Sequence, residues 1–300
     1  MALWNDLLQG AVFFWDGSDA GTLVNLSRWI VIGLAALLGV LPGYSMAAQT
    51  PSGPLIFAGS GSNVPITRLL AEAFRLVHPE ITIEIPASLG SGGGIRAAAD
   101  GAIAVGLISR PLKDAEQGWG LTVLPYAKTA VIVGVHPSVA EDGITYEELV
   151  LIFRGIKTRW QDGHPIVVLT REPGDSSLEV LERDIPGFLA ASAESYRTRR
   201  WKTLYTDQEM TATLARTPYA LGIADLGTVA AERLPIRALK LNGHVASPEH
   251  VRSGSYPLVK TLAFVFRRDR LPAGARAFLD FVRGPAGAKI LQANGYVLEE

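Results

Sequence analysis

The 300-residue sequence contains no cysteine. This absence excludes disulfide bonds, thiolate metal sites, iron–sulfur clusters and a cysteine nucleophile. An excess of one charge is also missing, because 28 lysines and arginines balance 29 aspartates and glutamates to a formal charge of −1. A broad basic surface for nucleic acid is therefore not expected, and any bound anion must be held by local groups.

The familiar catalytic motifs are missing as well. The chain has no Gly-x-Ser-x-Gly elbow, no Walker A motif, no complete Gly-x-Gly-x-x-Gly and no His-Glu-x-x-His. Its five histidines are scattered without the spacing of metal ligands. We therefore predict no catalytic residue, no metal ligand and no cofactor.

The N-terminal region has the layout of a secretory signal. Arg28 precedes an apolar run from Trp29 to Leu41, and small residues follow, with Ser45-x-Ala47 fitting a cleavage site. The run is shorter than the roughly 20 residues of a membrane-spanning helix. We predict that residues 1–47 form a cleaved signal peptide, with an uncleaved N-terminal anchor as the alternative, and hence export to the periplasm.

The residues before this run fit a signal peptide poorly. Residues 1–27 contain no lysine or arginine, whereas the start of a signal peptide is basic. This suggests that translation begins near Val24 rather than at Met1. N-terminal sequencing of the immature protein tests this, since a chain that begins at Met1 would contradict it.

Beyond residue 50, short apolar runs alternate with helical patterns, which predicts an α/β fold with mostly parallel strands. Strands are predicted at residues 55–58, 81–85, 103–107, 130–135, 166–169, 220–224 and 261–266. Helices are predicted at 65–76, 94–99, 146–153, from Ser177 onward, and at 273–282 and 286–293. Two α/β series of this size indicate two lobes with a ligand cleft between them.

Three loops rich in glycine and serine precede predicted helices, at residues 59–63, 90–94 and 174–177. Each could offer backbone N–H groups, hydroxyls and the positive end of a helix dipole to one anion. Taken singly, each could equally serve only as a turn and helix N-cap. Arg171 lies just before the third loop and could hold an oxyanion through two charge-assisted hydrogen bonds, or instead pair with Glu172 at the surface.

Several segments together resemble the phosphate-binding proteins of ABC transporters, which have the type II periplasmic binding-protein fold. The segments are GSGSNVP at 59–65, SLGSGGGI at 88–95, VGLISRPL at 105–112, YEELVLIFRGIKTRWQDGHPIVVLTREPGDSS at 146–177, YALGIADLG at 219–227 and SYPLVKTLAFVF at 255–266. They occur in family order across roughly residues 54–296, nearly all of the predicted mature chain. The resemblance implies a first lobe from 54–125 plus 257–300 and a second lobe from 126–256, each a βα sandwich.

The resemblance also implies a set of ligand-binding residues. The first lobe would contribute Ser62, the backbone of Asn63 and Val64, and Ser91, and the second lobe Arg171, Ser176 and Ser177. Arg171 is the only cation that the resemblance carries over. The implied ligand is inorganic phosphate or a similar oxyanion, the implied partner is an inner-membrane ABC permease, and we expect a monomer.

Two positions depart from the pattern of the family. Ser109 is followed by Arg110 where phosphate-specific members carry aspartate, and Asp175 stands where they carry serine. We expect Ser109, Arg110 and Asp175 to be ligand-binding residues as well. An aspartate in the site accepts a hydrogen bond from protonated phosphate and repels sulfate. Asp175 could supply this acceptor from the other lobe, pair with Arg110 or Arg171, or simply cap the helix that follows.

The sequence therefore predicts an exported, two-lobed binding protein for a tetrahedral oxyanion that closes on its ligand without covalent chemistry. A sensor or scaffold with an altered pocket is the first alternative, supported by Arg110 and Asp175. An exported phosphatase using the same anion cradle is the second.

Overall fold

The computed structural model describes residues 53–299. The predictions of a signal peptide or anchor at 1–47 and of a start near Val24 lie outside the described residues. No helix within 53–299 has both the length and the apolar character needed to cross a membrane.

The strands form a mixed sheet whose parallel parts lie at its two ends. The hydrogen-bonded order is β2 (Ile83–Glu84), β1 (Leu55–Gly59), β3 (Val105–Ile108), β11 (Val259–Phe266), β4 (Thr122–Val135), β8 (Ala220–Asp225), β6 (Val167–Arg171) and β7 (Lys202–Leu204). The pairs around β1 and around β6 are parallel, whereas β11 and β4 run antiparallel to each other and to their neighbours. Short strands β5 (Gly143–Ile144), β9 (Arg237–Ala238), β10 (Lys240–Leu241) and β12 (Val297–Leu298) complete the set.

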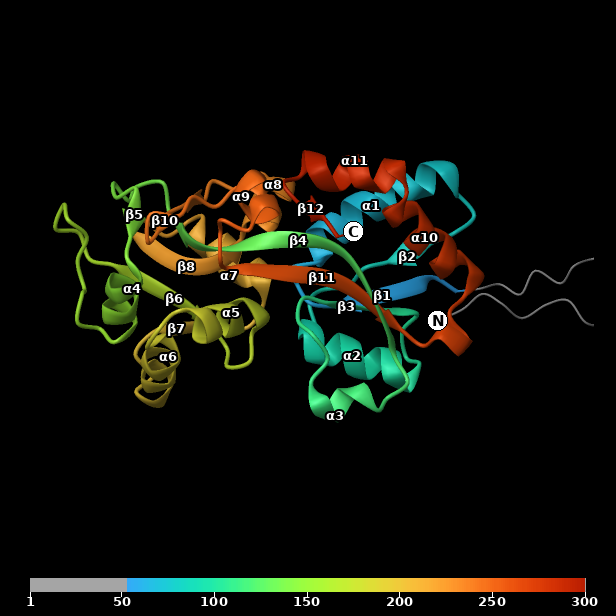
Figure 1. The fold of residues 1–300 in the computed structure, drawn as a ribbon, viewed down its shortest axis with the longest axis horizontal. Coiled ribbons are helices and arrows are strands. Elements are labelled where there is room, and N and C mark those ends of the chain that lie inside the picture. Colours follow the sequence, from blue (N-terminus) through green and yellow to red (C-terminus); the bar gives the residue numbers. More distant parts are fainter. Residues whose placement is uncertain (1–52, 300) are drawn as a thin grey trace, which may run out of the picture. The chain divides into compact units, whose positions relative to one another are not determined.

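Helices cover both sides of each parallel part. They are α1 (Val64–Val77), α2 (Gly90–Asp100), α3 (Asp114–Gln117), α4 (Tyr146–Phe153), α5 (Ser176–Asp184), α6 (Phe188–Arg197), α7 (Asp207–Leu214), α8 (Leu226–Ala231), α9 (Pro248–Ser253), α10 (Ala273–Arg283) and α11 (Pro285–Ala293). Figure 1 shows α1, α10 and α11 on one side of β1 and β3, with α2 and α3 on the other. α4 begins with a capping box in which Thr145 accepts from the Glu148 amide and Glu148 accepts from the Thr145 amide, which satisfies two free donors of its first turn.

Two hydrophobic cores define two lobes. The first lobe packs α1 and α10 on β1 and β11 through side chains such as Phe57, Phe74 and Phe278, which meet edge to face. The core of the second lobe includes Val133, Phe153 and Phe188, from β4, α4 and α6. The two-lobed α/β fold predicted from the sequence is confirmed. The boundaries at residues 126 and 257 stay a prediction.

The lobes are joined by β4 and β11, which run side by side from one to the other (Figure 1). β4 has 14 residues, whereas the sequence indicated a strand only from 130. Its first four positions alternate between half-buried and exposed and include Pro125, which weakened the strand signal.

One local prediction was wrong. Residues 90–94 do not form a loop before the second helix, because Gly90 is its first residue. A β-carbon added at Gly94 would lie 2.8 Å from the carbonyl oxygen of Ala58, so the glycine lets α2 pack directly against β1. The cost of glycine in a helix is offset here by close helix–strand packing.

Candidate functional site

The first loop brings two buried hydroxyls to the interface of the lobes. Ser60 and Ser62 follow β1 and are almost completely buried. The amides of Asn63 and Val64, expected to face an anion, instead donate to the carbonyls of Ser60 and Gly61 within the turn, at 3.1 and 3.2 Å. The Asn63 side chain points into the first lobe and donates to the carbonyl of Ile108. The loop contacts the second lobe through the Ser62 hydroxyl, which donates to Asp207, and through the carbonyl of Gly61, which accepts from Gln208.

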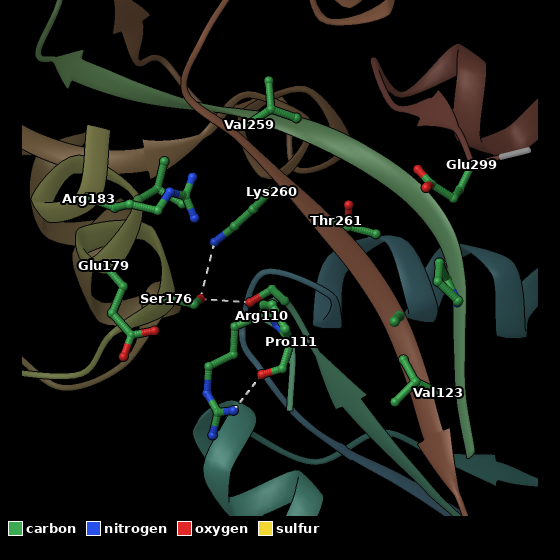
Figure 2. Close-up of a pocket in the computed structure, with 14 residues that line it drawn as sticks. Arg110, Pro111, Val123, Ser176, Glu179, Arg183, Val259, Lys260, Thr261 and Glu299 are labelled. Carbon is green, nitrogen blue, oxygen red and sulfur yellow. Dashed lines mark hydrogen bonds between the residues drawn. The ribbon is translucent and has the colours of Figure 1, made fainter. Parts of the chain in front are cut away.

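Ser109 joins the turns of both lobes. Its Oγ lies 2.7 Å from the Oγ of Ser60 and 2.7 Å from the Oγ of Ser176 on the second lobe. Its backbone N–H donates to the Oγ of Ser91 at 3.1 Å. The sequence placed these serines in separate turns, and the structure brings them into one connected group, part of which Figure 2 shows.

Lys260 lies at the centre of this group and was missed by sequence reasoning. Its ammonium donates to the Oγ of Ser62 at 2.6 Å and of Ser177 at 2.5 Å, and forms an ion pair with Asp225 at 2.9 Å. The Lys260 side chain is only 2% exposed, and a charge so deeply buried requires such partners. Arg171 is therefore not the only cation available at the site. A lysine inside an apolar strand was the sequence signal that could have identified it.

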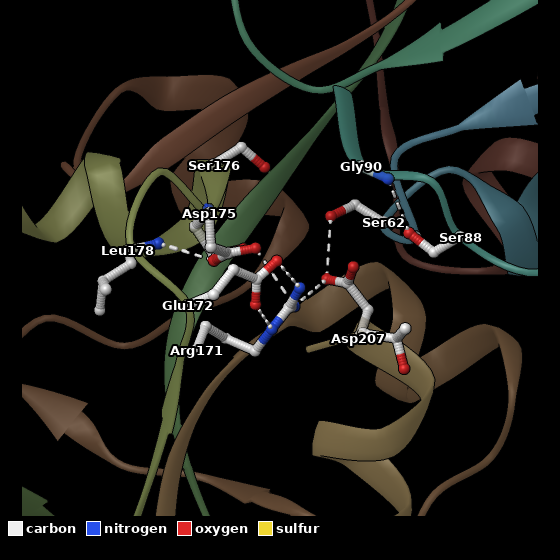
Figure 3. A network of polar contacts seen from close by, with 12 residues as sticks. Ser62, Ser88, Gly90, Arg171, Glu172, Asp175, Ser176, Leu178 and Asp207 are labelled. Atoms are coloured by element: carbon white, nitrogen blue, oxygen red, sulfur yellow. Dashed lines mark hydrogen bonds and ion pairs between the residues drawn. The ribbon is translucent and has the colours of Figure 1, made fainter. Parts of the chain in front are cut away.

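Arg171 lies at the end of β6 and is also buried. Its guanidinium pairs with Glu172, Asp175 and Asp207, each at 3.1 Å, and its Nε donates to the carbonyl of Leu204 (Figure 3). Burial alone would lower the pKa of Arg171, but the charges of Asp207 and Asp175 outweigh it and raise the pKa. The expected pair with Glu172 is present, but it forms part of a buried network.

Asp175 fills two of the roles that the sequence left open. Its Oδ1 accepts from the amides of Ser177 and Leu178 at 3.1 and 3.0 Å, which caps α5, and its Oδ2 faces Arg171. Burial, reinforced by the neighbouring charge of Asp207, raises the pKa of Asp175 to about 6. The carboxyl can therefore take up a proton close to neutral pH.

Arg110 lies apart from this network. Its guanidinium makes two hydrogen bonds to Glu116 of α3, at 2.7 and 2.8 Å, and a third to the carbonyl of Pro111. The hydrogen bond with Glu116 raises the pKa of Arg110, which thus stays charged within the first lobe. A pair between Arg110 and Asp175, one of the alternatives above, does not form.

Asp207, which the sequence did not single out, spans the lobes from the start of α7. Its carboxylate contacts Arg171 and accepts a hydrogen bond from Ser62 at 3.4 Å. A β-carbon at Gly61 would lie only 2.2 Å from Asp207 Oδ2, so glycine is required for this approach. The carboxylate thus occupies the space between the first loop and Arg171, the two elements expected to share an anion.

The charges of the site do not cancel. Buried Arg171 and Lys260 are matched by buried Asp175 and Asp225, and the partly exposed Glu172 and Asp207 also pair with Arg171, so carboxylates outnumber cations four to two. Among residues 53–299, no three histidine, aspartate or glutamate side chains are arranged to hold a metal ion. The group therefore combines the hydroxyls of Ser62, Ser176 and Ser177 with one ammonium, one guanidinium and several carboxylates.

Comparisons with known proteins agree with this architecture. "Phosphate-binding protein PstS 2" of Streptococcus agalactiae is 30% identical over 115 residues, which is 38% of this chain and 39% of the relative. "Phosphate-binding protein PstS" of Pseudomonas aeruginosa is 30% identical over 127 residues, 40% of this chain and 39% of the relative. The matched segment thus spans about two fifths of the length of these curated relatives.

The fold itself matches over a larger share of the chain. A Clostridium perfringens protein assigned as a phosphate ABC transporter substrate-binding protein, solved with bound phosphate, superposes with a TM-score of 0.73 at 24% identity and covers 83% of this chain and 100% of its own. The resemblance inferred from the sequence is confirmed. Residues 45–285 match the family described as the PBP superfamily domain, and the chain belongs to that family.

Proposed function

We propose that the protein is an exported solute-binding protein that captures a tetrahedral oxyanion, phosphate, between its lobes. The observation that carries this proposal is that the ammonium of Lys260 contacts the hydroxyls of Ser62, Ser176 and Ser177, and that Ser109 joins this group through Ser176. These hydroxyls come from three different turns on both lobes. An anion that replaces their mutual contacts would be held by both lobes at once, so ligand binding and lobe closure are coupled.

Binding of this kind requires no covalent step. Hydroxyl donors held in place by buried hydrogen bonds stabilise an anion without reorganisation of solvent, and Lys260 supplies a positive charge within the same group. Capture and release then depend only on the hinge formed by β4 and β11. The function proposed is transport binding, not catalysis.

Phosphate is the proposed anion because the relatives that match in sequence carry the name phosphate-binding protein. A solute-binding protein of this kind delivers its ligand to an inner-membrane ABC permease from the periplasm. Asp175 adds a specific reason, because its ionised carboxylate can accept a hydrogen bond from protonated phosphate, whereas sulfate has no proton to donate.

Calorimetry with phosphate, sulfate, molybdate and acetate tests the proposal on the wild-type protein and on two variants. Ser62→Ala and Ser176→Ala should each weaken phosphate binding about tenfold or more, since a hydrogen bond to a charged group contributes about 1.5–3 kcal/mol. Ser253→Ala, in an exposed stretch at the end of α9, is the matched control and should bind phosphate like the wild type. A folded wild-type protein that binds none of the four anions would refute the proposal.

A second function is favoured by one observation. Arg171 already has three carboxylate partners and Lys260 has a fourth, so both cations are paired without a ligand. A sensor or scaffold that presents this fold to a membrane partner would have such a site. Absence of anion binding in the calorimetry, with the lobes intact, would support this second function.

A further inference from the structure

A cavity lies beside the serine group, in the groove between the two lobes. It has a volume of about 430 Å³ and opens between α5 of the second lobe and the segment that follows β3 in the first. Strands β11 and β4 form its floor (Figure 2). The cavity and the candidate anion site share Ser109, Ser176 and Lys260, so the cavity lies directly against that site.

The two ends of this cavity differ in chemistry. Its inner wall consists of the hydroxyls of Ser109 and Ser176, with the Lys260 ammonium 3.5 Å from Ser176 Oγ. The rest of the wall is mostly apolar and is formed by Val123, Pro125, Val180, Val259, Thr261 and Ala263. Val259, Thr261 and Ala263 line the cavity from β11, and Lys260, which lies between them in sequence, reaches its inner wall.

The volume is too large for inorganic phosphate alone. A tetrahedral anion of five non-hydrogen atoms fills on the order of 100 Å³ when judged by the roughly 30 Å³ that a water molecule occupies in the liquid. A cavity of about 430 Å³ falls within the range of pockets that hold small organic ligands.

The charges at the rim indicate what the remaining space can accept. Arg110 and Arg183 line the rim together with Glu179 and Glu299, so the two signs are balanced. Arg110 is already neutralised by Glu116, and Arg183 by Asp184 at 2.6 Å. A second anionic group on the ligand would therefore gain little binding free energy from these arginines. An uncharged apolar group would instead bury its surface against the valines and Ala263.

We propose that the ligand is an organic phosphate, that is, a phosphate monoester or a phosphonate with one small apolar substituent. The oxyanion head is bound by the hydroxyls of Ser109 and Ser176 and by Lys260, and the substituent fills the cavity over β11. This inference rests on the proposed function, because it assigns the ligand class of the same site. It differs from that function in requiring a substituent on the phosphorus.

Titration calorimetry with phenyl phosphate, phenylphosphonate and inorganic phosphate tests the inference on the full chain. The wild-type protein should bind the two phenyl compounds at least tenfold more tightly than inorganic phosphate. Thr261→Phe fills the cavity from β11 and should remove this advantage while phosphate affinity stays within twofold of wild type. Val123→Trp fills it from β4, and because Val123 is 36% exposed, this change leaves the core intact.

Val167→Phe serves as the matched control, since Val167 is equally exposed on β6 and does not line the cavity. It should keep the wild-type preference. Phosphate binding without a preference for the phenyl compounds, or a preference that survives both cavity-filling changes, would overturn the inference and leave the proposed function standing. Failure of a folded wild-type protein to bind any of the three would overturn both.

Discussion

Removal of one carboxylate from the site should strengthen anion binding. Asp207 lies between Ser62 and Arg171, where an incoming anion would be held, and its charge opposes that anion. Two unit charges about 5 Å apart repel by about 3 kcal/mol at an effective dielectric constant near 20. The Asp207 side chain is 13% exposed, so solvent screens part of this repulsion. Asp207→Asn should therefore increase phosphate affinity about tenfold to a hundredfold.

Arg171 keeps its position in this variant because Asp175, Glu172 and the carbonyl of Leu204 still hold it. The assay is calorimetric titration with phosphate at pH 7 and low salt. Asp142→Asn removes the same charge from a side chain that is 84% exposed, and it should leave the affinity unchanged. Equal or weaker phosphate binding by Asp207→Asn, in a folded protein, would refute the reasoning that this carboxylate competes with the ligand.

Two further predictions concern stability. The pKa of Asp175 is raised in the folded protein, so ionisation of this carboxyl lowers the stability of the folded state as pH rises from about 4 to about 6. Asp175→Asn keeps the N-cap and should be more stable than wild type by up to about 3 kcal/mol at pH 7, and equal to it at pH 4. Denaturant unfolding at the two pH values measures this, and a pH-independent difference would contradict it. Gly227→Ala should lower the stability of the folded protein by about 1–3 kcal/mol, because a β-carbon there would lie 2.3 Å from the ring of Tyr296. Gly118 has open space around it, so Gly118→Ala should change thermal stability little. Equal melting temperatures for the two variants would contradict this.

The sequence by itself determined the architecture. Short apolar runs alternate with segments whose apolar residues recur at helical spacing, and this pattern predicts an α/β fold. Buried parallel strands must be apolar, and the helices that cover them must present an apolar stripe. The start of α5 was also predictable, since Asp175 and the serines after it, in the third of the glycine- and serine-rich segments, are strong capping residues. These are local properties that depend on near neighbours in the chain.

Conformations governed by contacts distant in sequence were harder to predict. The glycines at residues 90–94 predict a loop because glycine weakens a helix, yet the segment is helical because the missing side chain of Gly94 permits contact with β1. The early part of β4, residues 122–129, was not predicted because Pro125 and two exposed positions weaken the strand pattern there. It is a strand because it pairs with residues 260–266 of β11. Propensity was overridden by packing in both places.

Only the tertiary structure decided how the site is charged. Sequence motifs predicted the serines and Arg171, but nothing in their spacing showed that Lys260, Asp207 and Asp225 reach the same place from β11, α7 and β8. The energy of a buried charge depends on its distance from every other charge around it, and those distances are set by the fold rather than by order along the chain.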